Sequence, residues 1–133
     1  MVKYDDLVGI PYVSGGRDVR TGLDCWGLAV EIYRRQGLQL PPYPLDATSA
    51  AVTMAAFKSG LPQNWYRLGT PTPGCLVLIR FIGNPYGSHC GIYLGYGEFI
   101  HAYDTAVQID KIRRWGPRVI GYYLPRKGVY PSV

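Results

Sequence analysis

The clearest pattern of apolar and polar positions along the chain follows Asp24. The apolar side chains fall on one side of a helix: Trp26, Ala29, Val30 and Tyr33. The charged residues Glu31, Arg34 and Arg35 fall elsewhere on it. Asp24 is a suitable N-cap and Gly37 a suitable C-terminal cap, so the pattern predicts a helix that begins at Cys25.

Strand patterns dominate the second half of the chain. The run 75–82 is almost wholly apolar, and further strand candidates are 89–94, 98–103, 107–109 and 118–124. The first half predicts a helical turn at 3–8, a glycine-rich loop at 13–22, an extended proline-rich connector at 40–44, a second helix from about Thr48 to Lys58, and a loop at 65–73. Helices followed by an antiparallel sheet indicate an α+β fold.

The register of one predicted hairpin determines which side chains share a face of the sheet. If Gly95-Tyr96-Gly97 is a three-residue loop, Leu94 pairs with Glu98 and Gly91 lies opposite His101. His89 is then a diagonal neighbour of His101 on the same face. A loop of two or four residues shifts this parity and places Cys90 on the His101 face instead.

Length and composition fit one domain over residues 1–133. The chain has 133 residues, of which 47% are hydrophobic and 17% charged, enough for a single core. No apolar run is long enough to span a membrane, and Met1 to Asp6 lack the apolar segment of a signal peptide. We therefore expect a protein made in the cytoplasm that is either not exported by that route or leaves inside something larger.

The net charge of +5 favours anionic partners without choosing among nucleic acid, membrane surface and cell-wall polymer. Its basic residues are scattered apart from three short pairs: Arg34-Arg35, Arg113-Arg114 and Arg126-Lys127. No run interleaves aromatic residues with Lys or Arg, as a face that binds single strands would. This distribution argues against specific nucleic-acid binding.

Cys25 is the strongest candidate for chemistry because it stands where a glycine-rich loop meets a helix. Unpaired NH groups and the helix dipole stabilise a thiolate at that position. The only histidines, His89 and His101, are far along the chain, so the fold has to bring either one to the thiol. The three cysteines lack paired spacing, which favours reduced thiols over a disulfide framework.

Purely structural roles for these residues compete with this hypothesis. A buried cysteine is usually inert, and a lone histidine in a strand is more often a structural residue than a catalyst. Under the three-residue loop, Cys90 faces away from the histidines and is predicted to be a small core residue, like Cys75. Zinc is the other alternative, but no Cys-x-x-Cys pair is present, and we expect neither a metal nor a cofactor.

Five motifs in order resemble the NlpC family of papain-like cell-wall cysteine peptidases. They are Pro11-Tyr12 with Gly15-Gly16, Gly22-x-Asp24-Cys25-x-Gly27-Leu28, Pro73-Gly74-Cys75-Leu76-Val77, His89-Cys90-Gly91-Ile92-Tyr93-Leu94-Gly95, and Phe99-Ile100-His101-Ala102. Together they span nearly the whole chain. The resemblance implies a primitive papain-like α+β fold, with the catalytic cysteine at a helix N-terminus packed on an antiparallel β-sheet.

The resemblance also implies residue roles. Cys25 would be the nucleophile, His89 the general base and His101 the residue that orients His89. Tyr12 would donate its hydroxyl to the oxyanion or the substrate. The charge of Asp24 would oppose thiolate formation unless hydrogen bonds from helix NH groups to its carboxylate offset that charge.

Other residues near the expected cleft bear on the substrate. Arg17 and Arg20 are candidates for binding stem-peptide carboxylates, against the alternative of a solvated loop. The chain has Ser14 and Trp26 where many secreted relatives carry an aromatic residue and serine. Both positions border the expected cleft. The Trp26 form resembles the branch found among tail-assembly genes of tailed phages and prophages.

The expected function is hydrolysis of peptidoglycan stem peptides, often at the bond between D-glutamate and a diamino acid in this family. The phage resemblance implies an association with the virion tail, other tail proteins as partners, and action at the cell wall. Two alternatives stay open: a non-catalytic tail or wall-binding module with the same fold, and an amidase or transacylase that uses the same three residues.

Overall fold

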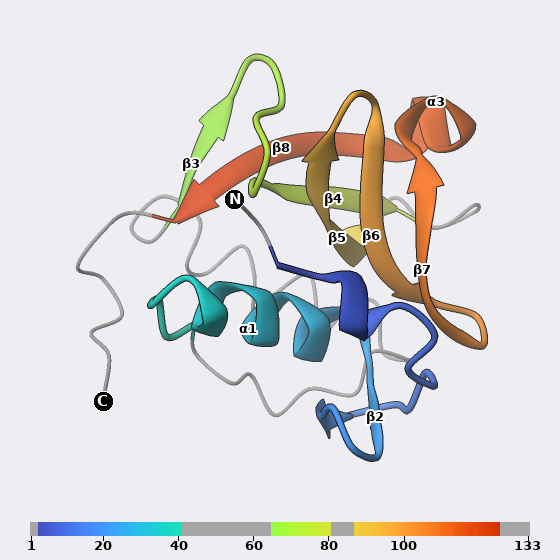
Figure 1. The fold of residues 1–133 in the computed structure, drawn as a ribbon. Helices are drawn as coiled ribbons and strands as arrows, with labels where there is room; N and C mark the ends of the chain where they lie inside the picture. Colours follow the sequence, from blue (N-terminus) through green and yellow to red (C-terminus); the bar gives the residue numbers. More distant parts are fainter. Residues whose placement is uncertain (1–2, 41–64, 81–86, 126–133) are drawn as a thin grey trace.

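The computed structural model describes residues 3–40, 65–80 and 87–125, and every structural statement below concerns these residues. The second helix expected from about Thr48 to Lys58 lies outside them. Within the described ranges, one long helix packs on an antiparallel sheet (Figure 1), so the prediction of an α+β fold is confirmed.

Helix α1 (Cys25–Arg35) begins and ends where its capping residues predict. The Asp24 side chain accepts a hydrogen bond from the Gly27 NH at 2.7 Å, which satisfies one of the helix's unpaired donors. At the other end Gly37 takes a φ of +85°, a conformation that suits glycine. Its NH bonds to the Arg34 carbonyl at 3.0 Å and closes the last turn.

Six strands form the main sheet in the order β3-β8-β4-β5-β6-β7, and every neighbouring pair is antiparallel. Their bounds are β3 (Trp65–Leu68), β4 (Leu76–Arg80), β5 (Gly87–Gly95), β6 (Glu98–Tyr103), β7 (Ala106–Lys111) and β8 (Val119–Pro125). The shorter elements are η1 (Asp5–Leu7), β1 (Arg17–Asp18), β2 (Gly22–Leu23), α3 (Ile112–Trp115) and η2 (Gly116–Arg118). The prediction of a loop throughout 65–73 is wrong, because β3 pairs along its length with β8.

Two apolar clusters lie on the two faces of this sheet. Helix α1 covers one face, where Leu28 and Ile32 pack with Leu78, Ile92 and Ile100. The opposite face carries a smaller cluster of Val77, Ile79, Phe99 and Trp115, the last of which belongs to α3. The alternation along β4 to β6 assigns successive side chains to different faces, as pleated strands require.

The β5–β6 hairpin closes differently from the prediction. Its turn has two residues, Tyr96 and Gly97, both with positive φ, and Gly95 rather than Leu94 pairs with Glu98. A bulge between Tyr93 and Gly95 then restores the predicted register, because Tyr93 pairs with Phe99 and Ile92 with Ile100. The loop length was wrong, yet the bulge preserves the parity on which the positions of His89 and His101 depend.

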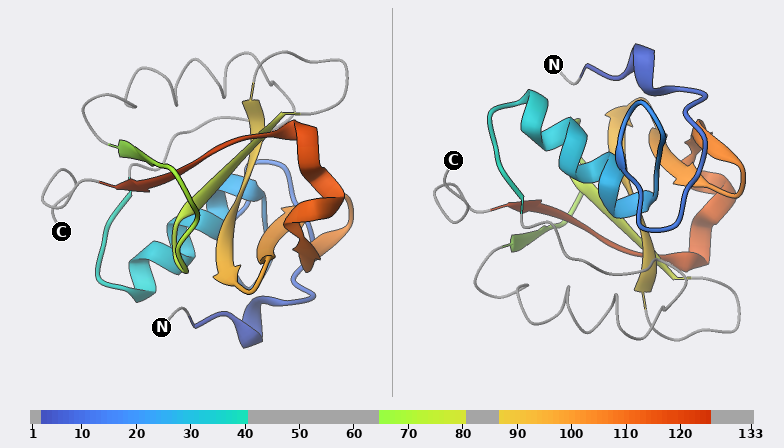
Figure 2. Two further views of the ribbon diagram at one scale, coloured as in Figure 1. Left: turned by 90° about the horizontal axis from the view of Figure 1, so that it is seen from above. Right: turned by 90° about the horizontal axis from the view of Figure 1, so that it is seen from below.

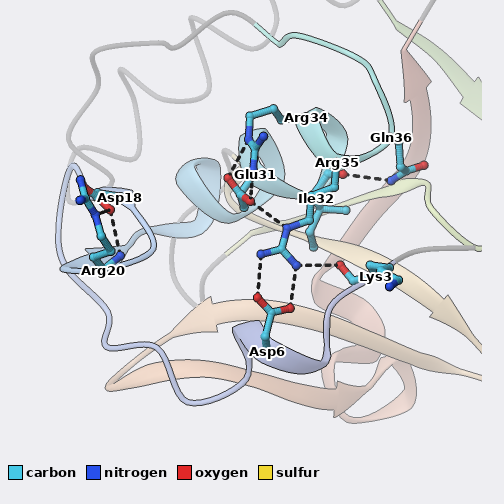
Figure 3. Close-up of polar contacts among 9 residues, drawn as sticks. All are labelled: Lys3, Asp6, Asp18, Arg20, Glu31, Ile32, Arg34, Arg35 and Gln36. Atoms are coloured by element: carbon cyan, nitrogen blue, oxygen red, sulfur yellow. Dashed lines mark hydrogen bonds and ion pairs between the residues drawn. The ribbon is translucent and has the colours of Figure 1, made fainter.

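The N-terminal segment is fastened to α1 by a charged cluster that Figure 3 shows. Arg35 contacts both carboxylate oxygens of Asp6, at 2.7 and 2.8 Å, and also bonds to Glu31 at 2.8 Å. This double contact gives a planar guanidinium well-defined geometry. The two views of Figure 2 show that the start of this segment lies near the C-terminal end of α1, the end that carries Arg35.

Candidate active site

Cys25 is the first residue of α1, and the adjoining loop is held by Asp24. The Asp24 carboxylate is fully buried and accepts hydrogen bonds from the NH groups of Gly27 and Gly15, at 2.7 and 3.0 Å. Its charge is balanced by Arg17, whose Nη1 lies 2.5 Å from Oδ1. Asp24 therefore acts as a capped and paired anion, which limits the opposition that its charge offers to a Cys25 thiolate.

The glycines of the Cys25 motif permit close packing of the loop on the helix. A Cβ on Gly27 would collide with the Gly16 carbonyl oxygen, so this position admits no side chain without movement of the loop. The same loop places the Gly16 carbonyl 3.3 Å from the Asp24 NH. The small residue after Cys25-Trp26 thus fixes the helix start against the segment that precedes it.

His89 and His101 form a hydrogen-bonded pair on adjacent strands β5 and β6. His89 Nε2 lies 2.8 Å from His101 Nδ1, and both side chains are buried. Gly91 makes room for the pair, because a Cβ there would lie 3.0 Å from the His101 Cβ. Nε2 is therefore the ring nitrogen of His89 that faces His101.

Aromatic rings enclose the two imidazoles. The Trp115 ring centroid lies 5.9 Å from that of His89 and 5.3 Å from that of His101. Tyr103 stacks on His101 with a centroid separation of 5.4 Å, and Phe99 packs at 4.4 Å. Burial among these rings, together with the nearby charge of His89, lowers the pKa of His101 to about 3, while Asp110 acts in the opposite direction. His101 is therefore neutral at ordinary pH.

Cys25 has the electrostatic environment of a reactive thiol. Hydrogen bonds from Cys90 and from His89, in that order of size, and the charge of His89 hold the pKa of Cys25 well below its ordinary value, against the effects of burial and Asp24. Burial raises the pKa of Cys75. The Cys25 hydrogen bond and burial raise the pKa of Cys90 well above its usual range. Of the three thiols, only Cys25 is favoured as a thiolate.

Cys90 is a member of the site that the sequence did not predict. It lies in the core cluster beneath α1, as expected, but its thiol also donates to the Cys25 carbonyl oxygen at 3.5 Å. Side chains alternate between the two faces of β5, so Cys90 lies on the face opposite the histidines but still contacts Cys25. The adjacency of His89 and Cys90 in sequence, one on each face of the strand, was the available signal.

Tyr12 and Trp26 lie near Cys25 in different ways. Tyr12 is half-buried and forms a parallel bridge with Leu23, which brings its backbone beside the segment that leads into Cys25. Trp26 is only 6% exposed and packs edge-on against Trp65 with ring centroids 6.3 Å apart. The ring packs in the core between α1 and β3, and the expectation that Trp26 borders a substrate cleft stays a prediction.

The two loop arginines occupy dissimilar positions. Arg17 is drawn inward by Asp24 and keeps 26% of its side chain exposed. Arg20 is 85% exposed and pairs with Asp18 at 2.9 Å, as Figure 3 shows. Arg17 thus has a structural task that the sequence did not reveal, and binding of a substrate carboxylate by either arginine stays a prediction.

Two other features of the described residues concern metal ions and membranes. No set of three or more His, Cys, Asp or Glu side chains is grouped there as a metal ion would need. Nor does any helix in those ranges combine the length and apolarity needed to cross a membrane. The polar groups that do converge are a thiol, two imidazoles and the first NH groups of a helix.

Comparison with known proteins identifies the family of the chain. The model of the NlpC/P60 family matches residues 9–123, and the chain belongs to that family. It is 32% identical over 118 residues to the "Probable peptidoglycan endopeptidase LytE" of Bacillus subtilis, covering 86% of this chain and 30% of the relative. It is 35% identical over 102 residues to the "Gamma-DL-glutamyl hydrolase" of the same organism, covering 74% and 21%.

A solved structure shows the same fold. The chain superimposes on an NLP/P60-family protein of Staphylococcus aureus, described as similar to a lipoprotein, with a TM-score of 0.62 and 26% sequence identity. The match covers 88% of this chain and 37% of that one. The chain therefore spans well under half the length of these relatives.

Proposed function

We propose that this chain is a cysteine endopeptidase that hydrolyses peptide bonds in the stem peptides of peptidoglycan. The observation that carries the proposal is Cys25, a thiol of lowered pKa at the N-terminus of α1, together with the His89–His101 pair at 2.8 Å. Family membership and the names of the two bacillary relatives support the substrate class.

The proposed chemistry is acyl transfer in two stages. His89 accepts the Cys25 proton at Nδ1, and the thiolate attacks the peptide carbonyl while NH groups at the start of α1, with Tyr12, stabilise the oxyanion. The C–N bond breaks as His89 returns the proton to the departing amine. Water, activated by His89, then cleaves the thioester and releases a carboxylate and the free thiol.

The experiment is a digestion of purified sacculi by the wild-type chain, followed by mass spectrometry of the released peptides. Walls with different diamino acids are used, with Cys25→Ala as the inactive variant and Cys75→Ala as a matched thiol control. The proposal expects release by the wild type and by Cys75→Ala only. Absence of release from every wall type contradicts it.

The finer parts of the proposal concern the bond and the route of delivery. We propose cleavage between D-glutamate and the diamino acid, supported by the name of the glutamyl hydrolase relative and tested by the masses of the products. We also propose that the chain acts from a phage or prophage tail, supported by the Cys25-Trp26 pair that resembles that branch. Immunodetection in purified tail particles tests this association, and its absence from them counts against it.

A thiolate titration and the product masses distinguish this proposal from the two alternative functions. A non-catalytic binding module would carry a Cys25 thiol of ordinary pKa, so an ultraviolet titration of the thiolate that matches a free cysteine supports that alternative. An amidase would leave products cut at a different bond. A transacylase would leave the acyl group on an added amine instead of releasing a carboxylate, which the product masses distinguish.

A further inference from the structure

The far side of the His89–His101 pair meets a carboxylate that the sequence did not single out. Asp110 lies in β7, next to the strand that carries His101, and its Oδ2 is 3.7 Å from His101 Nε2. The Asp110 side chain is 11% exposed and the His101 side chain wholly buried. Within the described residues, His101 Nε2 has no hydrogen-bond partner, and this carboxylate oxygen lies just beyond hydrogen-bond distance.

The proton positions on His89 and His101 follow from the proposed role of His89. To accept a proton from Cys25 at Nδ1, neutral His89 must carry its hydrogen on Nε2, which then donates to His101 Nδ1. His101 must accept at Nδ1, so its own hydrogen has to be on Nε2, the atom that faces Asp110. The opposite tautomer of His101 would set two NH groups against each other, or force His89 to lose its function as a base.

The Asp110 carboxylate is itself held in place and kept charged. Oδ2 accepts from Trp115 Nε1 at 3.0 Å, and Oδ1 accepts from the Lys111 NH at 2.9 Å and from Arg114 Nη1 at 3.1 Å. Burial works to raise the pKa of Asp110, but the Trp115 and Lys111 hydrogen bonds and the charge of Arg114 keep it below its ordinary value. Asp110 therefore presents a fixed negative charge to His101.

We propose that Asp110 is a positioning residue that selects the Nε2–H tautomer of His101 and thereby aims the lone pair of His89 Nδ1 at Cys25. The inference rests on the proposed function for its catalytic meaning, although the tautomer exists independently of any substrate. Proton transfer from Cys25 to His89 leaves the protons of His101 in place. The negative carboxylate also favours the imidazolium that this transfer creates, through the oriented His101 ring.

The competing explanation is that Asp110 only anchors α3 through Trp115. Asp110→Asn and Trp115→Phe separate the two. The amide keeps an acceptor for the Trp115 indole but loses the charge, and its NH₂ group can donate to His101 Nε2. Trp115→Phe removes the indole donor and leaves both the carboxylate and an aromatic ring. A purely anchoring role predicts wild-type values in Asp110→Asn, which keeps this acceptor, and a loss in Trp115→Phe, which removes the donor.

The test measures kcat and KM on muropeptides, the ultraviolet titration of the Cys25 thiolate, and thermal unfolding of the whole chain. Asp110→Asn is expected to lower kcat roughly 10- to 100-fold, the effect of removing a partner that orients an imidazole, with little change in KM. It also moves the thiolate titration to higher pH, whereas Trp115→Phe does not. Wild-type values in Asp110→Asn, or an equal loss in Trp115→Phe, overturn the proposal.

A second test uses the wild-type chain, so its result does not depend on whether a variant folds. Nitrogen-15 NMR of the histidine rings reports which nitrogen carries the hydrogen, and the proposal expects Nε2–H for His101 at neutral pH. The Nδ1–H tautomer would overturn it. If the wild type releases no wall peptide but shows this tautomer and the thiolate shift in Asp110→Asn, the proposed function fails and the role of Asp110 stands.

Discussion

The Cys90 thiol donates a hydrogen bond to the backbone carbonyl oxygen of Cys25, with sulfur and oxygen 3.5 Å apart across 65 positions of the chain. The contact ties the middle of β5 to the first residue of α1. When Cys25 is ionised, the single S–H of Cys90 can instead donate to the Cys25 sulfur, and this hydrogen bond is the largest effect that lowers the pKa of Cys25. Cys90, predicted from the sequence to be a small core residue, therefore influences the reactivity of the candidate nucleophile.

We predict that Cys90→Ala raises the pKa of Cys25. Loss of one hydrogen bond of about 1 kcal/mol should slow alkylation of Cys25 at mildly acidic pH by roughly fivefold. The measurement is the ultraviolet thiolate titration, with Cys25→Ala subtracted, together with the alkylation rate. Cys75→Ala is the control, because it deletes a buried thiol just before β4. An unchanged titration in Cys90→Ala contradicts the prediction.

Asp24→Asn should change stability and thiol reactivity in opposite senses. The amide retains a cap for Gly27 but leaves Arg17 without its anionic partner, so the free energy of unfolding should fall by about 2 kcal/mol. The Asp24 charge acts to raise the pKa of Cys25, and its removal should move the thiolate titration to lower pH. Urea unfolding and the ultraviolet titration measure the two effects.

Asp18→Asn provides the matched control for that variant. It deletes one carboxylate from the same loop, but the lost partner, Arg20, is 85% exposed. Exposed pairs contribute little, so its free energy of unfolding should stay close to that of wild type. Equal stability losses in the two variants would show that burial of the Asp24–Arg17 pair is unimportant.

Gly91→Ala should disturb the two histidines by displacing the strand that carries one of them. The added methyl group would lie 2.7 Å from the Ile100 carbonyl oxygen and from Phe99 Cδ2, contacts that require β6 to move. We expect a loss of about 1–3 kcal/mol in the free energy of unfolding and a fall in activity. Gly69→Ala is the control, since its Cβ meets nothing within 4 Å. Equal stability of the two variants refutes the prediction.

Local signals predicted the parts of the site that local physics determines. Asp24 and Gly37 correctly marked the ends of α1, because caps act within one turn. The β3 strand was missed because its burial alternates poorly, and pairing with β8 rather than its own sequence makes it a strand. Sequence correctly predicted the face shared by His89 and His101, although a bulge, and not loop length, sets it.

Contacts between distant segments could not be predicted in the same way. The approach of Asp110 to His101 depends on the β6–β7 register and on Trp115, which lies in a four-residue helix without a strong sequence pattern. The pairing of Arg17 with Asp24 depends on the path of a loop that glycines leave unrestricted. Both contacts join residues of ordinary types, so composition and spacing carry no sign of them.

The Asp6–Arg35 contact should make stability sensitive to pH in the acid range. The Arg35 hydrogen bonds lower the pKa of Asp6 from 3.8 to about 2. Because the folded pKa is the lower one, the contact stabilises the fold at pH values above 3.8 and is lost as the pH falls towards about 2. The melting temperature of Asp6→Asn should therefore lie below that of wild type at neutral pH, and the difference should shrink across this window. Asp5→Asn, in the same turn, reports the effect of removing one negative charge alone. A difference that stays constant down to the lowest pH, or one that Asp5→Asn reproduces, would show that the contact with Arg35 is not its cause.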